Sequence, residues 1–199
     1  MIKEAPHAYP RTVRIGGKNL SVRLVSADDR AAILAFARSL PEHDLLFLPR
    51  DITDEATVDQ WLGECAAGLG TTIVAEAGGE IAGYATIRRG ELRWSAHVAE
   101  LQVLIAPATR GKGLGRLLTH EAFTLALAQG IEKMVAQMTL DQKSAVATFE
   151  GLGFRPEALL RDHVKDRQGT KHDLLVLSHE VATFAGRAEG YGVWEAFGR

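Results

Sequence analysis

The stretch that most constrains the fold of this chain runs from Val98 to Gln129. An apolar, strand-like run, AELQVLIAP, is followed by ATRGKGLGR and then by the helical pattern LLTHEAFTLALAQ. The turn between them carries three glycines in five residues, Gly111, Gly113 and Gly115. The first turn of a helix has unpaired N–H groups and the positive end of the helix dipole. Because glycines leave these N–H groups open to approach, the stretch predicts an anion site where a strand enters a helix.

Three cations in the same turn, Arg110, Lys112 and Arg116, favour a phosphate-bearing ligand. The whole chain offers no comparable charge, because 23 Lys and Arg residues stand against 25 Asp and Glu residues, for a net charge of -2. This balance gives no electrostatic reason to expect a nucleic acid or a membrane surface as a partner. The basic site is therefore local.

The 199 residues suit one domain, with or without a tail. The N-terminus lacks the apolar core of a signal peptide, and no run approaches the roughly 18 apolar residues of a membrane span. Cys65 is the single cysteine, so it cannot form an internal disulfide, and it is expected to be a small buried or half-buried thiol on a helix. No spacing suggests a metal site. We therefore expect a cytoplasmic protein in a reducing compartment, with no membrane segment.

Periodicity and turn signals predict the element order β-β-α-α-β-β-β-α-β-α-β-β, which gives a mixed sheet with helices on both faces. Trp61 lies on an apolar helical stripe and is expected in the core. The segment 42–50 is predicted to be a loop or a short helical turn. The predicted strands are 12–15, 20–25, 71–77, 80–88, 96–105, 132–139, 158–165 and 172–178, and the predicted helices are 31–40, one from 52 onward, 113–129 and 142–151.

Two common phosphate-binding motifs do not fit the glycine turn. A P-loop needs Gly-x-x-x-x-Gly-Lys followed by Ser or Thr, whereas Lys112 is followed by Gly113. A dinucleotide fingerprint needs a third glycine three residues after the second, and that position is Arg116. That fingerprint also normally lies in the first strand–helix unit, whereas this turn lies past the middle of the chain.

A third motif fits. The hexapeptide from Arg110 to Gly115 resembles the Q/R-x-x-G-x-G/A turn of the GNAT acetyltransferases, which in that family binds the pyrophosphate of acetyl-CoA. Downstream, residues 144–154 (SAVATFEGLGF) are similar to the family's A-x-x-x-Y/F-E-x-x-G-F segment. The final hairpin, with Lys165-Asp166 and His172-Asp173-Leu174, is similar to that of bacterial members, including lysine-acetylating ones. Together the resemblance covers about residues 11–180.

The resemblance implies an α/β fold with a mixed, mostly antiparallel, twisted sheet of about six or seven strands and helices on both faces. The acyl-CoA site is expected where the family's strands 4 and 5 splay apart, with acetyl-CoA as cosubstrate and no metal. The strand before the turn would contact the pantetheine arm and the thioester carbonyl through the main chain of Val103, Leu104 and Ile105. The implied pyrophosphate-binding residues are Arg110, Gly111, Lys112, Gly113, Leu114, Gly115 and Arg116.

Glu100 is the candidate general base, as the sole carboxylate between His97 and Ile105. Strand alternation puts Glu100, Gln102 and Leu104 on one face, and related enzymes often have a glutamate at this strand position. A carboxylate beside a low-dielectric channel would have a raised pKa, so that it accepts the proton of an amine near neutral pH. His97, on the other face by strict alternation, is the weaker candidate.

One position departs from the family pattern. Many members have a tyrosine in the later helix that protonates the leaving thiolate, and this chain has Phe149 there. The thiolate is then left to water or another group, and an acyl-CoA-binding sensor with little turnover is the alternative function. Gln142 occupies the place of an asparagine that contacts the pantetheine in many relatives, and its amide can make similar hydrogen bonds. Tyr191, in the C-terminal tail, is a late candidate donor.

The leading hypothesis is an N-acetyltransferase whose acceptor is a primary amine: a protein lysine, or a small amine such as a polyamine, an amino acid or an aminoglycoside. Acceptor selection is expected in residues 26–66. The carboxylates there would attract a cationic amine, although solvated helix ends explain them equally well. The polar residues of interest in this segment are His43 and the carboxylates Asp44, Asp51, Asp54 and Glu55.

The chain divides into an extended lead-in over residues 1–10, an acetyltransferase domain over residues 11–180 and a tail over residues 181–199. The tail carries four aromatic residues between glycines. It is therefore expected to pack on this domain or on a partner, which favours a homodimer.

Overall fold

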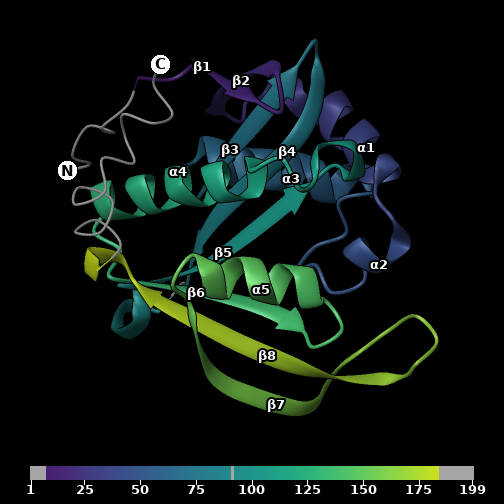
Figure 1. Cartoon of the computed structure of the whole chain (residues 1–199), viewed down its shortest axis with the longest axis vertical. Helices are drawn as coiled ribbons and strands as arrows, with labels where there is room; N and C mark the ends of the chain where they lie inside the picture. The colour runs from purple at the N-terminus through teal and green to yellow at the C-terminus, as the bar shows by residue number, and fades with distance from the viewer. Residues whose placement is uncertain (1–7, 91, 184–199) are drawn as a thin grey trace.

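The computed structural model describes residues 8–90 and 92–183 and contains one eight-stranded sheet (Figure 1). The strand order is β1-β2-β3-β4-β5-β6-β8-β7. All neighbours are antiparallel except β5 and β6, which are parallel. The strands are β1 (Arg11–Ile15), β2 (Lys18–Leu24), β3 (Gly70–Ala77), β4 (Glu80–Arg89), β5 (Val98–Ile105), β6 (Lys133–Thr139), β7 (Arg155–Lys165) and β8 (Lys171–Glu180).

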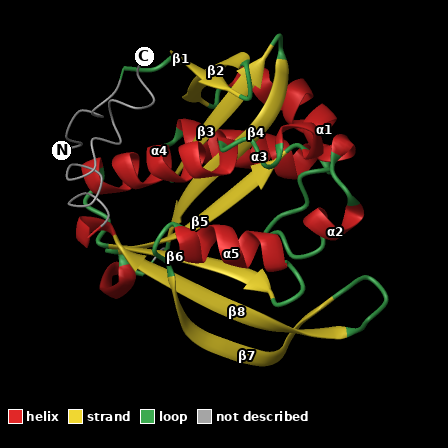
Figure 2. Ribbon diagram, viewed as in Figure 1, coloured by secondary structure: helices red, strands yellow, loops and turns green. Residues whose placement is uncertain are grey.

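Helices cover both faces of the sheet, as predicted from the element order (Figure 2). The helices are α1 (Arg30–Ser39), α2 (Glu42–Leu45), α3 (Glu55–Ala66), α4 (Leu114–Ala128) and α5 (Lys143–Gly151). Apolar residues of α4 and α5 form one core cluster with the sheet, and those of α1 and α3 form a second cluster on the other face. Trp61 is in the second cluster, packed against Tyr84, which confirms it as a core residue.

The helix α4 begins and ends on glycines. Gly113 is its N-cap with a φ of 89°, in the left-handed region. At the other end, Gly130 has a φ of 72° and the N–H of Ile131 bonds back to the carbonyl of Ala126 at 2.9 Å. This is the arrangement expected of a C-terminal glycine cap. The local pattern thus fixes both ends of the helix that follows the glycine turn.

The parallel strands β5 and β6 are paired over only three residues each. Their register runs from Val98 opposite Lys133 to Glu100 opposite Val135. Beyond that point β5 continues to Ile105 and β6 to Thr139 without pairing to each other. The two strands therefore diverge, which confirms the expected splay in the middle of the sheet.

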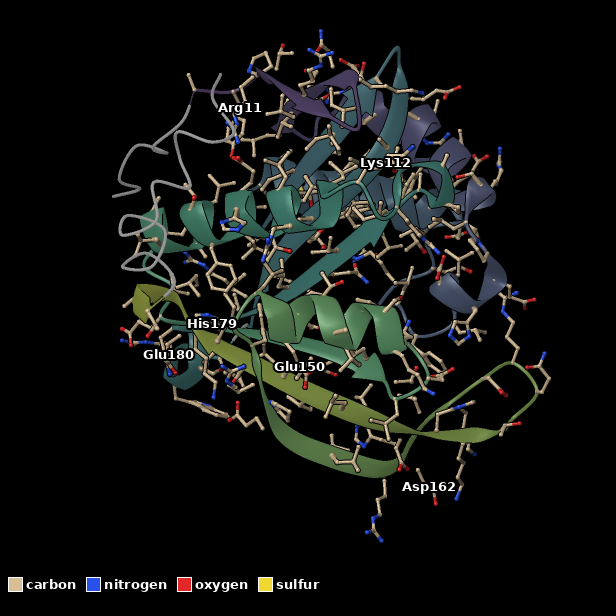
Figure 3. All side chains as sticks on the ribbon, in the orientation of Figure 1. Arg11, Lys112, Glu150, Asp162, His179 and Glu180 are labelled. Atoms are coloured by element: carbon tan, nitrogen blue, oxygen red, sulfur yellow. The ribbon has the colours of Figure 1, made fainter. Side chains whose placement is uncertain are left out.

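The family-based expectation of about six or seven strands was too low, because the sheet has eight. The first of them, β1, forms a hairpin with β2 around Gly16 and Gly17. Helix α4 also holds this region, because its buried Glu121 accepts hydrogen bonds from Tyr9 and Arg11. Figure 3 shows Arg11 at the edge of the sheet next to α4. These long-range bonds explain why so short a strand is ordered.

The last hairpin is longer than the pattern predicts, because β7 begins at Arg155 rather than 158 and β8 extends to Glu180 rather than 178. Segment 42–50 contains the four-residue helix α2, consistent with the expected helical turn. Cys65 is half-buried, as predicted. Residues 1–7 of the lead-in and 184–199 of the tail, with Tyr191, lie outside the described residues. No helix within the described part of the chain is long and apolar enough to cross a membrane.

Candidate active site

A cavity of about 860 Å³ opens between the diverging strands β5 and β6. Its size is in the range of small-molecule and cofactor sites. It contains all the residues predicted for the cofactor site or the general base except Lys112. Those that line it are Glu100, Val103, Leu104, Ile105, Arg110, Gly111, Gly113, Leu114, Gly115, Arg116, Gln142 and Phe149.

The glycine turn leaves open space beside the start of α4. Gly111 and Gly113 have φ values of 71° and 89°, and a Cβ atom added to either would meet nothing within 4 Å. The N–H of Leu117 bonds to the carbonyl of Gly113 at 3.0 Å, so the N–H groups of residues 114–116 precede the first helical hydrogen bond of α4. The turn therefore forms a concave, N–H-lined surface that fits a phosphate group.

The three cations of the turn have different surroundings. Arg110 donates from Nε to the carbonyl of Ile105 at 3.2 Å and from Nη2 to the carboxylate of Asp44. Lys112 folds back along its own loop, with Nζ donating to the carbonyl of Ala108 at 2.7 Å. In Figure 3 it lies at the N-terminal end of α4. Arg116 lines the cavity from the first turn of that helix.

Strand β5 forms the wall opposite β6. Its side chains alternate as predicted, with Leu101, Val103 and Ile105 packed toward α4 and Leu104 packed in the cluster of α1 and α3. After Glu100 the edge of β5 that faces β6 has no paired strand. The backbone N–H and C=O groups of that edge therefore face the cavity, where an extended ligand can bond to them.

The carboxylate of Glu100 has a cationic partner. Arg88 on β4 lies directly opposite Glu100 in the antiparallel register, and its Nη2 donates to Glu100 Oε2. From the sequence, Glu100 was expected to lie beside a low-dielectric channel, and the bond from the guanidinium of Arg88 to its carboxylate was not predicted. His97, in contrast, is exposed and precedes β5, and it is not among the residues that line the cavity.

The start of α5 closes the other side. Gln142 is the N-cap of this helix, and its Oε1 accepts the backbone N–H of Thr139 at 3.2 Å. The ring of Phe149 is 8% exposed and packs edge to face on Phe154, with ring centroids 4.9 Å apart. Both side chains line the cavity. The residue in place of the family's tyrosine is thus held firmly by the core.

Several contacts around the cavity were not predicted from the sequence, although His43 and Asp44 were named as part of the acceptor-selecting segment and do line the cavity. His43 lies on α2, with Nε2 3.3 Å from Oδ2 of Asp141 in the turn before α5. Phe47 lies against His172 of β8, with ring centroids 5.4 Å apart. These contacts join residues about 100 positions apart in the sequence. The acidic bias of residues 26–66 was the one available signal, and it pointed to this region without identifying the contacts.

The model of the acetyltransferase (GNAT) family matches residues 33–154. The chain belongs to the GNAT acetyltransferase family. The matched stretch begins in α1 and ends just before β7, so it contains the glycine turn, Glu100 and Phe149. Among the residues that the structure describes, no group of three or more His, Cys, Asp or Glu is arranged to hold a metal ion.

Two named acetyltransferases are similar to parts of the chain. YwnH of Bacillus subtilis, provisionally named a phosphinothricin acetyltransferase, is 32% identical over 42% of this chain and 51% of its own length. The mycothiol acetyltransferase of a Nocardioides species is 27% identical over 50% of this chain and 36% of its own length. The match therefore spans about half the length of YwnH and about a third of the length of the mycothiol acetyltransferase.

The fold of a solved structure, provisionally named an acetyltransferase, also matches. The structure of yncA from Salmonella typhimurium with its cofactor acetyl-CoA superposes with a TM-score of 0.73 and 23% identity, over 82% of this chain and 95% of that one. At this identity the likeness establishes the shared fold. It places the splayed strands and the glycine turn of the present chain in a known GNAT architecture.

Proposed function

We propose that this protein transfers an acetyl group from acetyl-CoA to a primary amine, with Glu100 as general base. The observation that carries the proposal is the unpaired edge of β5 beside the glycine turn. An anion-binding turn and an open strand edge in one cavity suit a ligand with a diphosphate at one end and an amide-containing arm at the other. Bound acetyl-CoA would supply the thioester.

The open edge of β5 also supports the chemistry. As an amine adds to the thioester, the carbonyl oxygen gains negative charge, and a fixed backbone N–H stabilises it without reorganisation. Val103 and Ile105 direct their main-chain groups to this edge. The main-chain groups of Leu104 face β4 instead, because the N–H of Ala106 bonds to the carbonyl of Ala82 at 2.9 Å and the direction of pairing alternates along β5. The side chains of Val103 and Ile105 carry no reactive group, so their role in the proposal is confined to the backbone.

In this proposal Glu100 accepts the proton of the amine. An alkylammonium has a pKa near 10.4 and lacks a free electron pair at pH 7, so it must lose a proton before it can attack. Glu100 is the carboxylate on the β5 wall of the cavity. Phe149 cannot donate a proton, so the departing thiolate takes its proton from water in this proposal.

The test is thiol release from acetyl-CoA with a panel of amines: amino acids, polyamines, lysine peptides and aminoglycosides. We expect amine-dependent release. Glu100→Gln should lower kcat by about a hundredfold or more between about pH 6 and 9. Glu80→Gln, an exposed glutamate at the start of β4, is the matched control and should leave kcat unchanged.

Two results would contradict the proposal in different ways. If Glu100→Gln turns over as fast as the unaltered protein, Glu100 is not the base. If acetyl-CoA binds tightly but no amine releases thiol above background, the protein is an acyl-CoA-binding sensor rather than a transferase.

A further inference from the structure

Arg88 and Glu100 form a charge pair on the wall of the cavity. They lie directly opposite each other on β4 and β5, and the guanidinium donates to the carboxylate. Their side chains are 44% and 27% exposed, and both residues line the cavity. A ligand at this point of the cavity therefore meets a positive and a negative group side by side.

Each of the other two carboxylates of the cavity also has a basic side chain beside it. Among the described lining residues the carboxylates are Glu100, Asp44 and Asp141. Asp44 bonds to Arg110, and Asp141 lies 3.3 Å from His43. A polyamine needs several unpaired negative groups, and this cavity does not present them. Paired opposite charges instead complement a ligand that carries both signs.

We propose that the acceptor is an amino acid or a closely similar amine that carries a carboxylate near its amino group. Arg88 binds the carboxylate and Glu100 binds the ammonium, so that Arg88 determines specificity. The planar guanidinium can form two parallel hydrogen bonds to a carboxylate. The inference rests on the proposed acetyl transfer and narrows its substrate class.

The proton balance of the reaction favours such an acceptor. The ammonium gives one proton to Glu100, which becomes neutral, and the amine nitrogen then bonds to the acetyl carbon as the bond from that carbon to sulfur breaks. The second proton passes from nitrogen through water to the thiolate. Once Glu100 has taken up the proton, its neutral carboxyl group no longer balances the positive charge of Arg88. The carboxylate of the bound acceptor then serves as the negative partner of Arg88. An amine without a carboxylate leaves Arg88 unpaired at this step.

The experiment compares L-amino acids with their C-terminal amides as acceptors, with spermidine and a lysine peptide included. The best free acids should exceed their amides by about tenfold or more in kcat/KM, the value of a charge-assisted hydrogen bond. Arg88→Gln should bring this ratio close to one by raising KM for the acids, whereas the loss of its bond to Glu100 changes kcat for acids and amides alike and leaves the ratio as the measure. Arg88→Lys, which keeps the charge but loses the paired geometry, should retain part of the ratio.

Arg89→Gln is the matched control. Arg89 is adjacent in sequence and on the opposite face of β4, where its Nη2 donates to the carbonyl of Gln129. Arg89→Gln should leave the ratio of kcat/KM for the free acids to kcat/KM for the amides unchanged. Calorimetric binding of acetyl-CoA and thermal unfolding establish that each variant is folded. If Arg88→Gln does not fold, the ratio in the unaltered protein and in Arg88→Lys decides the question.

Amides or spermidine that react as fast as the free acids would overturn the inference and leave acetyl transfer in place. The same holds if Arg88→Gln keeps the full preference for acids. If no amine of any kind releases thiol, both the inference and the proposed function fail.

Discussion

Gly113 combines two roles at one residue. Its φ of 89° starts α4 in the left-handed region, a Cβ atom added there would meet nothing within 4 Å, and the residue lines the cavity. For Gly113→Ala we expect a loss of about 1 kcal/mol in the free energy of unfolding, because a side chain disfavours this conformation. Acetyl-CoA affinity should fall at least tenfold, because the new methyl group occupies the space for phosphate. Urea unfolding and calorimetry measure the two effects.

Gly79→Ala separates these two effects. Gly79, in the turn between β3 and β4, has a φ of 86° and an equally open Cβ position, but it does not line the cavity. It should show a similar loss of stability with unchanged affinity for acetyl-CoA. Equal losses of affinity in both variants would show that backbone strain alone weakens binding.

At the scale of the element, α2 contacts three other segments of the chain through three consecutive residues, two of which line the cavity. Glu42 accepts a hydrogen bond at 3.0 Å from Arg167 in the turn between β7 and β8. His43 lies near Asp141, and Asp44 bonds to Arg110. A helix of one turn has little stability of its own, so these contacts hold it in place.

The double variant Glu42→Gln, Asp44→Asn should loosen α2 without unfolding the domain. The pairs are partly exposed, so the free energy of unfolding should fall by less than about 1 kcal/mol per pair. Hydrogen exchange of the amides in residues 42–48 should become at least tenfold faster, because local opening no longer breaks two ion pairs. Unchanged exchange in this segment would contradict the role given to the pairs.

Asp59→Asn is the control for that experiment. It breaks a surface pair with Arg30 between α1 and α3, away from the cavity. Exchange in residues 42–48 should stay as it is in the unaltered protein.

At the scale of the whole molecule, His120 makes stability depend on pH. Burial lowers the pKa of this α4 residue to about 4, and the charge of Arg116 adds to the effect. An unfolded histidine has a pKa near 6.5. Between these two values the unfolded chain binds more protons, so stability falls as pH falls from about 6.5 to about 4.

We expect the unaltered protein to lose about 1 kcal/mol more than His120→Gln between pH 7 and pH 5, allowing for partial exposure of the ring. Urea unfolding at the two pH values measures this. His97→Gln, at an exposed histidine, is the control and should keep the slope of the unaltered protein. If the stability of His120→Gln depends on pH as steeply as that of the unaltered protein, the role given to His120 is wrong.

The pair of Asp29 with Arg23 acts at lower pH. The guanidinium of Arg23 lowers the pKa of Asp29, so the stabilisation from this pair is lost only as pH falls below about 4.

Much of this architecture could be predicted because its signals are local. Alternation and helical periodicity located all eight strands and the long helices, with errors of a few residues at their ends. The glycine turn was found from its glycine spacing, Gln142 and Phe149 were found through the resemblance to the GNAT family, and the cavity brings them together. Lys112 is the exception, because a flexible side chain can fold back on its own loop, and spacing does not determine where its charge points.

The sequence by itself determined the order of elements, the anion-binding turn and the family, because each depends on residues close together in the chain. Only the tertiary structure decided that Arg88 faces Glu100 and that Asp44 of α2 pairs with Arg110 of the glycine turn. These contacts depend on the register of two strands and on which loops the sheet order brings together. Such long-range pairing has no period or spacing in the sequence, since it is set by packing of the whole domain.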